Sequence, residues 1–297
     1  MRLRARGLGA LLLAALAGAA AADEPFDGAA ALRHVERLVA LGPRPAGSAA
    51  AAQARRYLVD RLRAAGIRAE VQPFEADTPH GRLPMANVVA VLPGRRPDVI
   101  LLGGHYDTKL FREFRFVGAN DGGSSAALLL ELARRLHARP REFTYWIAWF
   151  DGEEARVTWT AADSLYGSRR MAEDLRRAGR LPRAVLVADM IGDRDLGIRR
   201  EAFSTPWLTD LVWASARRLG YGAHFSDDPL PVEDDHAPFL RHGVPAALLI
   251  DFDFPPWHTP GDTLDQVSAR SLEVVGRVLL DALPAIEAHL ARTPGGR

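Results

Sequence analysis

Apolar and polar positions follow two different periodicities along this chain. Short runs rich in β-branched residues, bounded by Pro, Gly or Asp, predict strands at residues 87–92, 99–103, 143–150, 184–188 and 246–250. Apolar residues at helical spacing predict helices at residues 29–41, 49–65, 124–138, 166–178, 206–219 and 269–291. Several of the strand runs are apolar on both faces, which is typical of strands buried between layers of helices.

Strands that alternate with helices predict an α/β fold with three layers (α/β/α), in which helices flank a mostly parallel, twisted central sheet. In such sheets the ligand site lies beyond the carboxyl ends of the strands. Acidic and histidine residues follow four of the predicted strands: His105 with Asp107, the segment 151–154, Asp189, and His258. We therefore expect these side chains to meet at one edge of the sheet.

The first 22 residues have the order of a secretory signal peptide. Basic residues come first, an apolar run extends from Leu8 to Ala17, and small residues precede Asp23. This run is shorter than the roughly 20 residues that span a bilayer, although a short N-terminal anchor is the alternative. We expect cleavage after Ala22 and export to the periplasm or the medium, with no membrane contact afterwards. Residues 23–292 are expected to form one catalytic domain and residues 293–297 a disordered tail.

Composition narrows the possible chemistry. The chain has no cysteine, so any metal must be bound through nitrogen and oxygen ligands. The formal net charge of +1 becomes −2 when the signal peptide takes three arginines with it. The remaining arginines fall in short runs at helical spacing, which favours solvated helix faces over a stripe that binds nucleic acid.

Three carboxylates crowd the end of one very apolar predicted strand. Asp151, Glu153 and Glu154 occupy three of four consecutive positions. Mutual repulsion makes this arrangement costly unless a cation or a shared proton offsets it. A metal ligand beside a general base explains the cluster, and a solvated acidic turn is the alternative.

Two further residues complete a candidate metal site. Asp121 stands just before a predicted helix, where a carboxylate either caps the helix or binds a metal. His258, between Trp257 and Thr259, is either a packed loop histidine or a ligand. With Glu154 these residues form a set of two carboxylates and one imidazole, which is the composition of a catalytic zinc site with an open fourth position.

Several motifs resemble those of the M28 metallopeptidases in order and spacing. They are Gly103-Gly104-His105-Tyr106-Asp107, Gly118-Ala119-Asn120-Asp121, Gly152-Glu153-Glu154, Asp189-Met190-Ile191-Gly192, Asp235-His236 and His258-Thr259. Within that group, four features resemble the animal-type glutaminyl-peptide cyclotransferases. The first two are His105-Tyr106-Asp107-Thr108-Lys109 and the insertion after Glu154, which contains Trp159 and Asp163-Ser164-Leu165-Tyr166-Gly167. The other two are the run from Glu233 to Arg241 and the aromatic residues Phe254 and Trp257 before His258.

The resemblance implies a role for each candidate residue. It implies an M28 zinc-peptidase-like fold, one Zn²⁺ per chain, and the conversion of N-terminal glutamine of peptides and proteins to pyroglutamate with release of ammonia. The implied metal ligands are Asp121, Glu154 and His258, the implied catalytic residues are Glu153, Asp189 and Asp234, and the implied substrate-binding residues are Lys109, Trp159, Phe254 and Trp257. A monomer without nucleic-acid or membrane partners is expected.

Two other classes of protein remain as alternatives. A two-zinc aminopeptidase would use His105, Asp121, Glu154, Asp189 and His258, all of which are present. A catalytically silent domain on the same scaffold would have lost ligands, and none is lost here. The chain departs from the cyclotransferase pattern at Gly104 and Ala126, which stand where those enzymes often have a disulfide. It also departs at Leu248, which replaces a histidine on the last predicted strand and puts a hydrogen bond and the rate in doubt.

Overall fold

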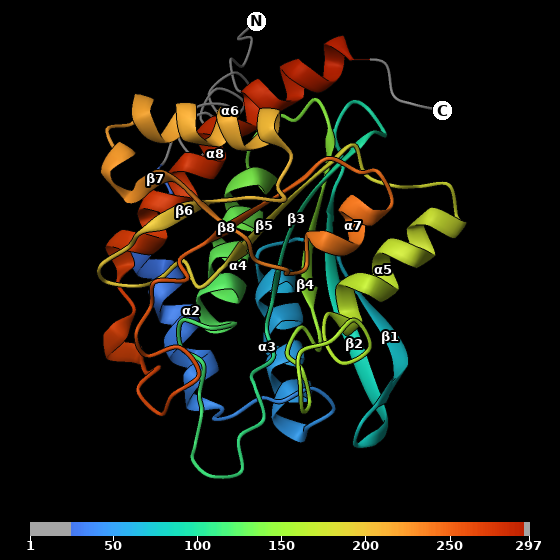
Figure 1. Ribbon diagram of the computed structural model, residues 1–297. Coiled ribbons are helices and arrows are strands. Elements are labelled where there is room, and N and C mark those ends of the chain that lie inside the picture. The colour runs from blue at the N-terminus through green and yellow to red at the C-terminus, as the bar shows by residue number, and fades with distance from the viewer. Residues whose placement is uncertain (1–24, 294–297) are drawn as a thin grey trace, which may run out of the picture.

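The computed structural model describes residues 25–293. Six strands form a central sheet in the order β1-β2-β4-β3-β5-β8 (Figure 1). Their bounds are β1 (Ala69–Thr78), β2 (Gly81–Leu92), β3 (Val99–His105), β4 (Thr144–Phe150), β5 (Ala184–Asp189) and β8 (Ala246–Ile250). The pairs β3–β4, β3–β5 and β5–β8 are parallel, whereas β1–β2 and β2–β4 are antiparallel. The sheet is therefore mixed, with its parallel part around β3 and β5.

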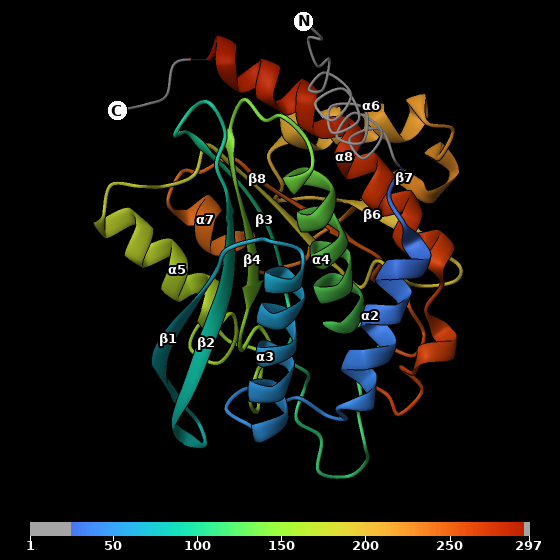
Figure 2. The same cartoon turned by 180° about the vertical axis from the view of Figure 1, so that it is seen from behind.

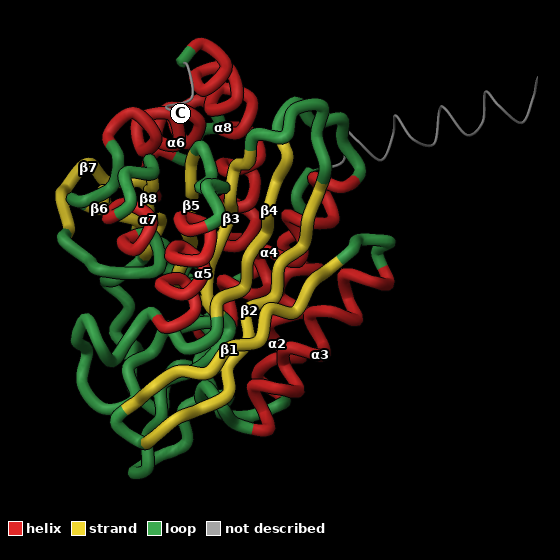
Figure 3. Tube along the Cα trace, turned by 90° about the vertical axis from the view of Figure 1, so that its right-hand side faces the viewer, coloured by secondary structure: helices red, strands yellow, loops and turns green. Residues whose placement is uncertain are grey.

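Helices cover both faces of the sheet and make the predicted three layers (Figures 2 and 3). One face carries α2 (Gly28–Ala40), α3 (Ala49–Ala64), α4 (Gly123–His137) and α8 (Ala269–Arg292), with α6 (Pro206–Arg218) beside α8; the other face carries α5 (Tyr166–Arg177) and α7 (Ala237–Arg241). The helix α4 is buried along nearly its whole length, including polar residues such as Ser124, Ser125 and Glu131, as expected of a helix enclosed by a sheet and other helices. Its position fixes the turn that precedes it against the sheet edge.

The predicted helices are confirmed, each with ends within one residue of the expected bounds. The five predicted strands are also present, and β2 begins six residues earlier than the pattern indicates. The sequence pattern missed β1, α7 and the small parallel pair formed by β6 (Ile198–Glu201) and β7 (Phe225–Leu230). β1 is an edge strand with mostly exposed positions and a proline, so it lacks the apolar run that marks a buried strand.

Short elements complete the chain. Two 3₁₀ turns, η1 (Gly222–His224) and η2 (Leu264–Gln266), precede β7 and α8. Among residues 25–293, no helix has the length and apolar character that a membrane crossing requires. The predicted signal peptide at residues 1–22 lies outside the described residues, as does the tail apart from Thr293.

Candidate active site

The carboxyl ends of β3, β4, β5 and β8 meet at one edge of the sheet, as the sequence predicts. Asp121 lies in the turn between β3 and α4, Glu154 follows β4, and His258 lies in the loop after β8. The His258 Nε2 atom lies 3.0 Å from Glu154 Oε1 and 3.3 Å from Asp121 Oδ2. One ligand atom from each of these three residues lies within 4.8 Å of the others, so the group has the size of a metal site.

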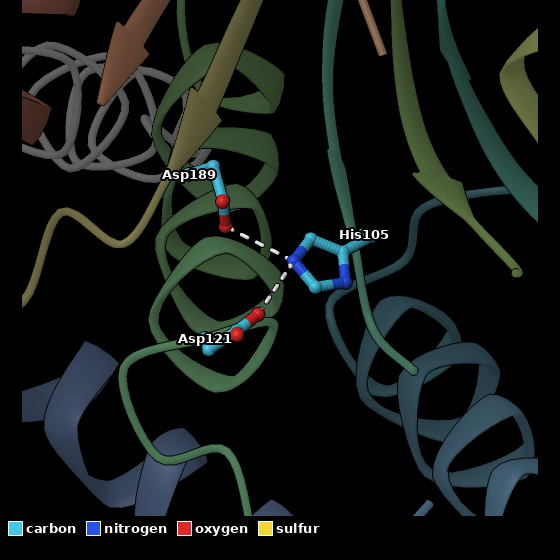
Figure 4. Close-up of side chains that lie close together, drawn as sticks. All are labelled: His105, Asp121 and Asp189. Atoms are coloured by element: carbon cyan, nitrogen blue, oxygen red, sulfur yellow. Dashed lines mark hydrogen bonds and ion pairs between the residues drawn. The ribbon is translucent and has the colours of Figure 1, made fainter. Parts of the chain in front are cut away.

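A second group of the same kind shares Asp121 with the first (Figure 4). The His105 Nε2 atom lies 3.0 Å from Asp189 Oδ1 and 3.2 Å from Asp121 Oδ1. Its other ring nitrogen lies 3.5 Å from Asp107 Oδ1. The side chains therefore allow two neighbouring cation positions bridged by Asp121, and residue types alone do not distinguish one metal from two.

The two groups differ in their access to solvent. Asp121, Glu154 and His258 all line a pocket of about 400 Å³, whereas His105 does not line it and is 1% exposed. The imidazole of His105 lies beneath the turn at Gly122, where an added Cβ would stand 3.0 Å from the ring. Only the group that contains His258 therefore presents all of its ligands to the pocket.

A hydrogen bond from its backbone N–H holds Asp121 in place, and the side chain of Asp121 does not cap a helix. The N-cap of α4 is Gly122, which makes no side-chain capping bond, so helix capping does not explain Asp121. The backbone N–H groups of Asn120 and Asp121 donate to the two carboxylate oxygens of Asp262 at 2.7 and 3.0 Å. The Asp121 carboxylate is thereby free to face the two histidines.

Charges within the site shift several pKa values. Burial raises the pKa of Asp121, but hydrogen bonds from His105 and His258 outweigh burial and hold this pKa below its usual range. Burial and then Asp121 raise the pKa of Glu154 to about 7. Burial lowers the pKa of His258, but contacts with Asp121 and Glu154 raise it to about 10. Such a concentration of negative charge around two imidazoles is the electrostatic setting that a divalent cation requires.

Glu153 stands beside the metal group and faces the same pocket. Its backbone N–H donates to Asp107 Oδ1 at 3.1 Å, and its carbonyl oxygen accepts from Leu165. Burial raises the pKa of its side chain well above the usual value; His105 opposes this effect, and Asp234 reinforces it. A carboxyl group with a raised pKa holds a proton more readily than a free one, which suits it to carry a proton between two groups of a substrate.

The insertion after Glu154 carries Trp159 to the mouth of the pocket. The Asp163 carboxylate accepts hydrogen bonds from the backbone N–H groups of Arg156, Val157 and Thr158, which closes the loop. Trp159 is 38% exposed, and its Nε1–H donates to Glu233 Oε2 at 3.3 Å. The large exposed indole is therefore held over the pocket by a loop that Asp163 folds.

The structure brings most of the predicted site residues to this pocket. Its lining includes the predicted Lys109, Trp159, Asp189, Asp234 and Trp257 in addition to Glu153 and the three metal-ligand candidates. Phe254 is placed elsewhere: it is 2% exposed and belongs to the hydrophobic core on the α5 face of the sheet. Phe252 takes its place in the lining, with its ring centroid 4.7 Å from that of Trp257. Leu248 is also buried in that core.

Three residues with clear structural roles were not singled out by the sequence pattern. Asp262 holds the Asp121 turn, Phe252 lines the pocket, and Glu233 accepts the Trp159 indole N–H. Glu233 begins a motif that was recognised, and Phe252 lies two residues before Phe254, so both were within reach of the motif. Asp262 carries no signal of its own, because its role is a contact across 141 residues of sequence.

Comparison with known proteins agrees with the site. Residues 87–283 match Peptidase family M28. A glutaminyl-peptide cyclotransferase-like protein of Mus musculus is 33% identical over 269 residues, which cover 80% of this chain and 70% of the mouse protein.

Two solved structures show how widely the fold is shared. The glutaminyl cyclase of an Acidobacteriales bacterium is 41% identical, with a TM-score of 0.85 over 90% of this chain and 96% of that one. A leucine aminopeptidase precursor from Bacteroides thetaiotaomicron is 25% identical, with a TM-score of 0.81 over 87% of this chain and 97% of that one. The family match, the mouse relative and the bacterial cyclase together show that this chain belongs to peptidase family M28 and, within it, to the glutaminyl-peptide cyclotransferases.

Proposed function

We propose that this enzyme uses one zinc ion to convert N-terminal glutamine of peptides and proteins to pyroglutamate, with release of ammonia. The observation that carries the proposal is the group Asp121–Glu154–His258, which opens on the pocket with Glu153 beside it. The glutaminyl-peptide cyclotransferases named above support the choice of substrate.

The side chains present fit a zinc ion. Two carboxylates and one imidazole are the donor types of a three-ligand catalytic zinc site. The Oδ2 atom of Asp121 is buried, and the polar group recorded next to it is the Nε2 atom of His258 at 3.3 Å, itself a candidate ligand, so both atoms can turn to a cation between them. When bound, zinc would supply Lewis-acid chemistry by polarising the side-chain carbonyl of the substrate glutamine.

The residues of the chain supply proton transfer. Glu153 takes a proton from the α-amine as the amine nitrogen forms a bond to the side-chain carbonyl carbon. The bond from that carbon to the amide nitrogen then breaks, and Glu153 returns the proton to the departing nitrogen. One molecule of ammonia leaves and no water is consumed, so the atoms balance.

Two aspartates and a set of aromatic rings complete the proposed site. Asp189 and Asp234 line the same pocket as Glu153, where they would orient the leaving amide. Trp159, Trp257 and Phe252 would enclose the glutamine in a ring-like pose and exclude water, which favours cyclisation over hydrolysis.

A two-zinc aminopeptidase is the second candidate, because His105, Asp121 and Asp189 also have the spacing of a metal site. The burial of His105 behind the pocket favours one metal that is accessible to substrate. We further propose that the enzyme acts as an exported monomer.

Metal stoichiometry and product analysis test the proposal together. The purified enzyme should contain about one zinc per chain and release ammonia, without any free amino acid, from peptides that begin with glutamine. A content near two metals per chain with release of the N-terminal amino acid would establish the aminopeptidase instead.

A further inference from the structure

The segment 109–118, which joins β3 to the turn before α4 (Figure 1), contains three phenylalanines that no step of the proposed reaction uses. Two of them, Phe111 and Phe116, contact the imidazole of His258. The ring centroids lie 5.6 Å apart for Phe111 and 5.8 Å for Phe116, with interplanar angles of 73° and 90°. Both contacts are edge-to-face, the geometry that aromatic pairs favour.

His258 needs support from its surroundings because its backbone is strained. Its φ angle is 53°, in the left-handed region that a residue with a side chain rarely adopts. The side chain of Trp257 stacks on its ring, with the two ring centroids 4.2 Å apart. The imidazole is therefore in contact with three aromatic rings: that of Trp257, which stacks on it, and those of Phe111 and Phe116, a pair that we call the aromatic collar.

Among the described residues, only one ring nitrogen of His258 has a hydrogen-bonding partner. A ligating histidine normally has its second ring nitrogen held by a carboxylate, a backbone carbonyl or water. The Nε2 atom of His258 faces Glu154 and Asp121, but none of the described residues forms a hydrogen bond with its Nδ1 atom. Apart from these contacts with the other two candidate ligands, ring packing is the protein contact that orients this imidazole.

We propose that the aromatic collar positions His258 for metal binding, in the role that a hydrogen-bonded partner plays at other metal sites. This inference rests on the proposed metal site and extends it to two residues outside the ligand set. By limiting rotation of the imidazole before the ion arrives, the collar lowers the conformational entropy lost on binding.

The two ends of segment 109–118 lie near the other two candidate ligands, one end near Glu154 and the other in the turn that leads to Asp121. The Lys109 Nζ atom lies 3.8 Å from Glu154 Oε2 and donates to the Ala155 carbonyl at 2.8 Å. At the other end, the buried Arg44 guanidinium donates to the carbonyls of Val117 and Gly118 at 2.6 and 3.0 Å. Because Gly118 precedes Asp121 by three residues, one segment links the surroundings of all three ligands.

Zinc affinity of the metal-free enzyme, measured by competition with a chromophoric chelator, tests the collar. Phe111→Leu and Phe116→Leu should each raise the Kd for zinc about tenfold, at the lower end of the effect of losing a partner of a metal-binding histidine. Phe111→Tyr, which keeps the ring, should restore the affinity to near the wild-type value.

Phe114→Leu is the matched control. Phe114 lies in the same segment, is partly exposed like Phe111 and stacks on it at 4.5 Å, but has no ring contact with His258. The zinc Kd of Phe114→Leu should stay near that of the wild type. Since Phe116 is fully buried, the thermal unfolding of each metal-free variant is measured in parallel, and Phe111→Leu should unfold near the wild-type temperature.

Two results would overturn the inference: wild-type zinc affinity in both Leu variants, or an equal loss of affinity in Phe114→Leu. A wild-type enzyme that binds no zinc would instead overturn the proposed metal site, and the collar with it.

Discussion

The Asp262 carboxylate holds the backbone of Asp121 through a hydrogen bond of 3.0 Å from the Asp121 N–H to Oδ2. The other carboxylate oxygen accepts the N–H of Asn120. Both donors belong to the turn that presents Asp121 to the two histidines. A single buried side chain from the loop after β8 therefore sets the conformation of the turn that follows β3.

We predict that Asp262→Asn weakens zinc binding about tenfold, as is typical when a group that orients a ligand is lost. The amide keeps one acceptor oxygen and turns its NH₂ group toward the second backbone N–H, so one donor loses its partner. Chelator competition measures the change, with the exposed Asp265→Asn in the same loop as the control. Unchanged zinc affinity in Asp262→Asn would show that the turn is held by other contacts.

Replacing Glu153 with glutamine should abolish most activity without removing the metal. The amide has nearly the same shape but cannot accept the amine proton, so kcat should fall by a factor of about 10² to 10⁴. Ammonia release and zinc content measure the two effects separately. Glu233→Gln, which alters another pocket-lining carboxylate, should lower kcat far less. Near-normal turnover in Glu153→Gln would remove Glu153 from the proposed role.

Phe252 and Phe254 should respond differently to truncation. Phe252→Ala removes a wall of the pocket, so KM for glutamine peptides should rise with little change in stability. Phe254→Ala leaves a cavity in the core and should lower the free energy of unfolding by about 3–5 kcal/mol. Peptide kinetics and urea denaturation separate the two outcomes. If KM rose for Phe254→Ala under conditions where the variant remains folded, Phe254 would have to be assigned to the substrate site after all.

Asp251 at the end of β8 should make stability depend on pH. Burial raises its pKa to about 6, although the Gly197 N–H, which donates to Oδ2 at 2.7 Å, opposes the shift. Because the pKa is higher in the folded than in the unfolded chain, this contribution to stability is complete below about pH 4 and is lost as pH rises through 6.

Between pH 4 and 7, the unfolding free energy of the wild type should therefore fall by up to about 3 kcal/mol more than that of Asp251→Asn. This figure follows from the rise of the Asp251 pKa from 3.8 to about 6. Urea denaturation of both proteins at the two pH values measures this double difference. Asp77→Asn, at an exposed position on β1, provides the control. A constant difference between wild type and Asp251→Asn across this range would contradict the prediction.

The local sequence pattern was sufficient to predict the helices and strands that are buried on one face or on all sides. Helices such as α2 and α8 carry an apolar face at helical spacing, and β5 is buried at every position, so short stretches of sequence identify them. β1, β6 and β7 are exposed or short, and the energy that holds them comes from pairing with a neighbouring strand. Such pairing leaves little trace in the pattern of one segment.

The sequence by itself determined which residue types stand at the carboxyl ends of the strands, because those positions follow directly from recognisable apolar runs. Only the tertiary structure decided that His105 is buried behind the pocket while His258 opens on it, and that Phe252 rather than Phe254 faces the pocket. Likewise, the contacts of Asp262 with Asp121 and of the collar with His258 join residues more than 140 positions apart. Such contacts depend on how the loops pack together, and no local periodicity encodes that packing.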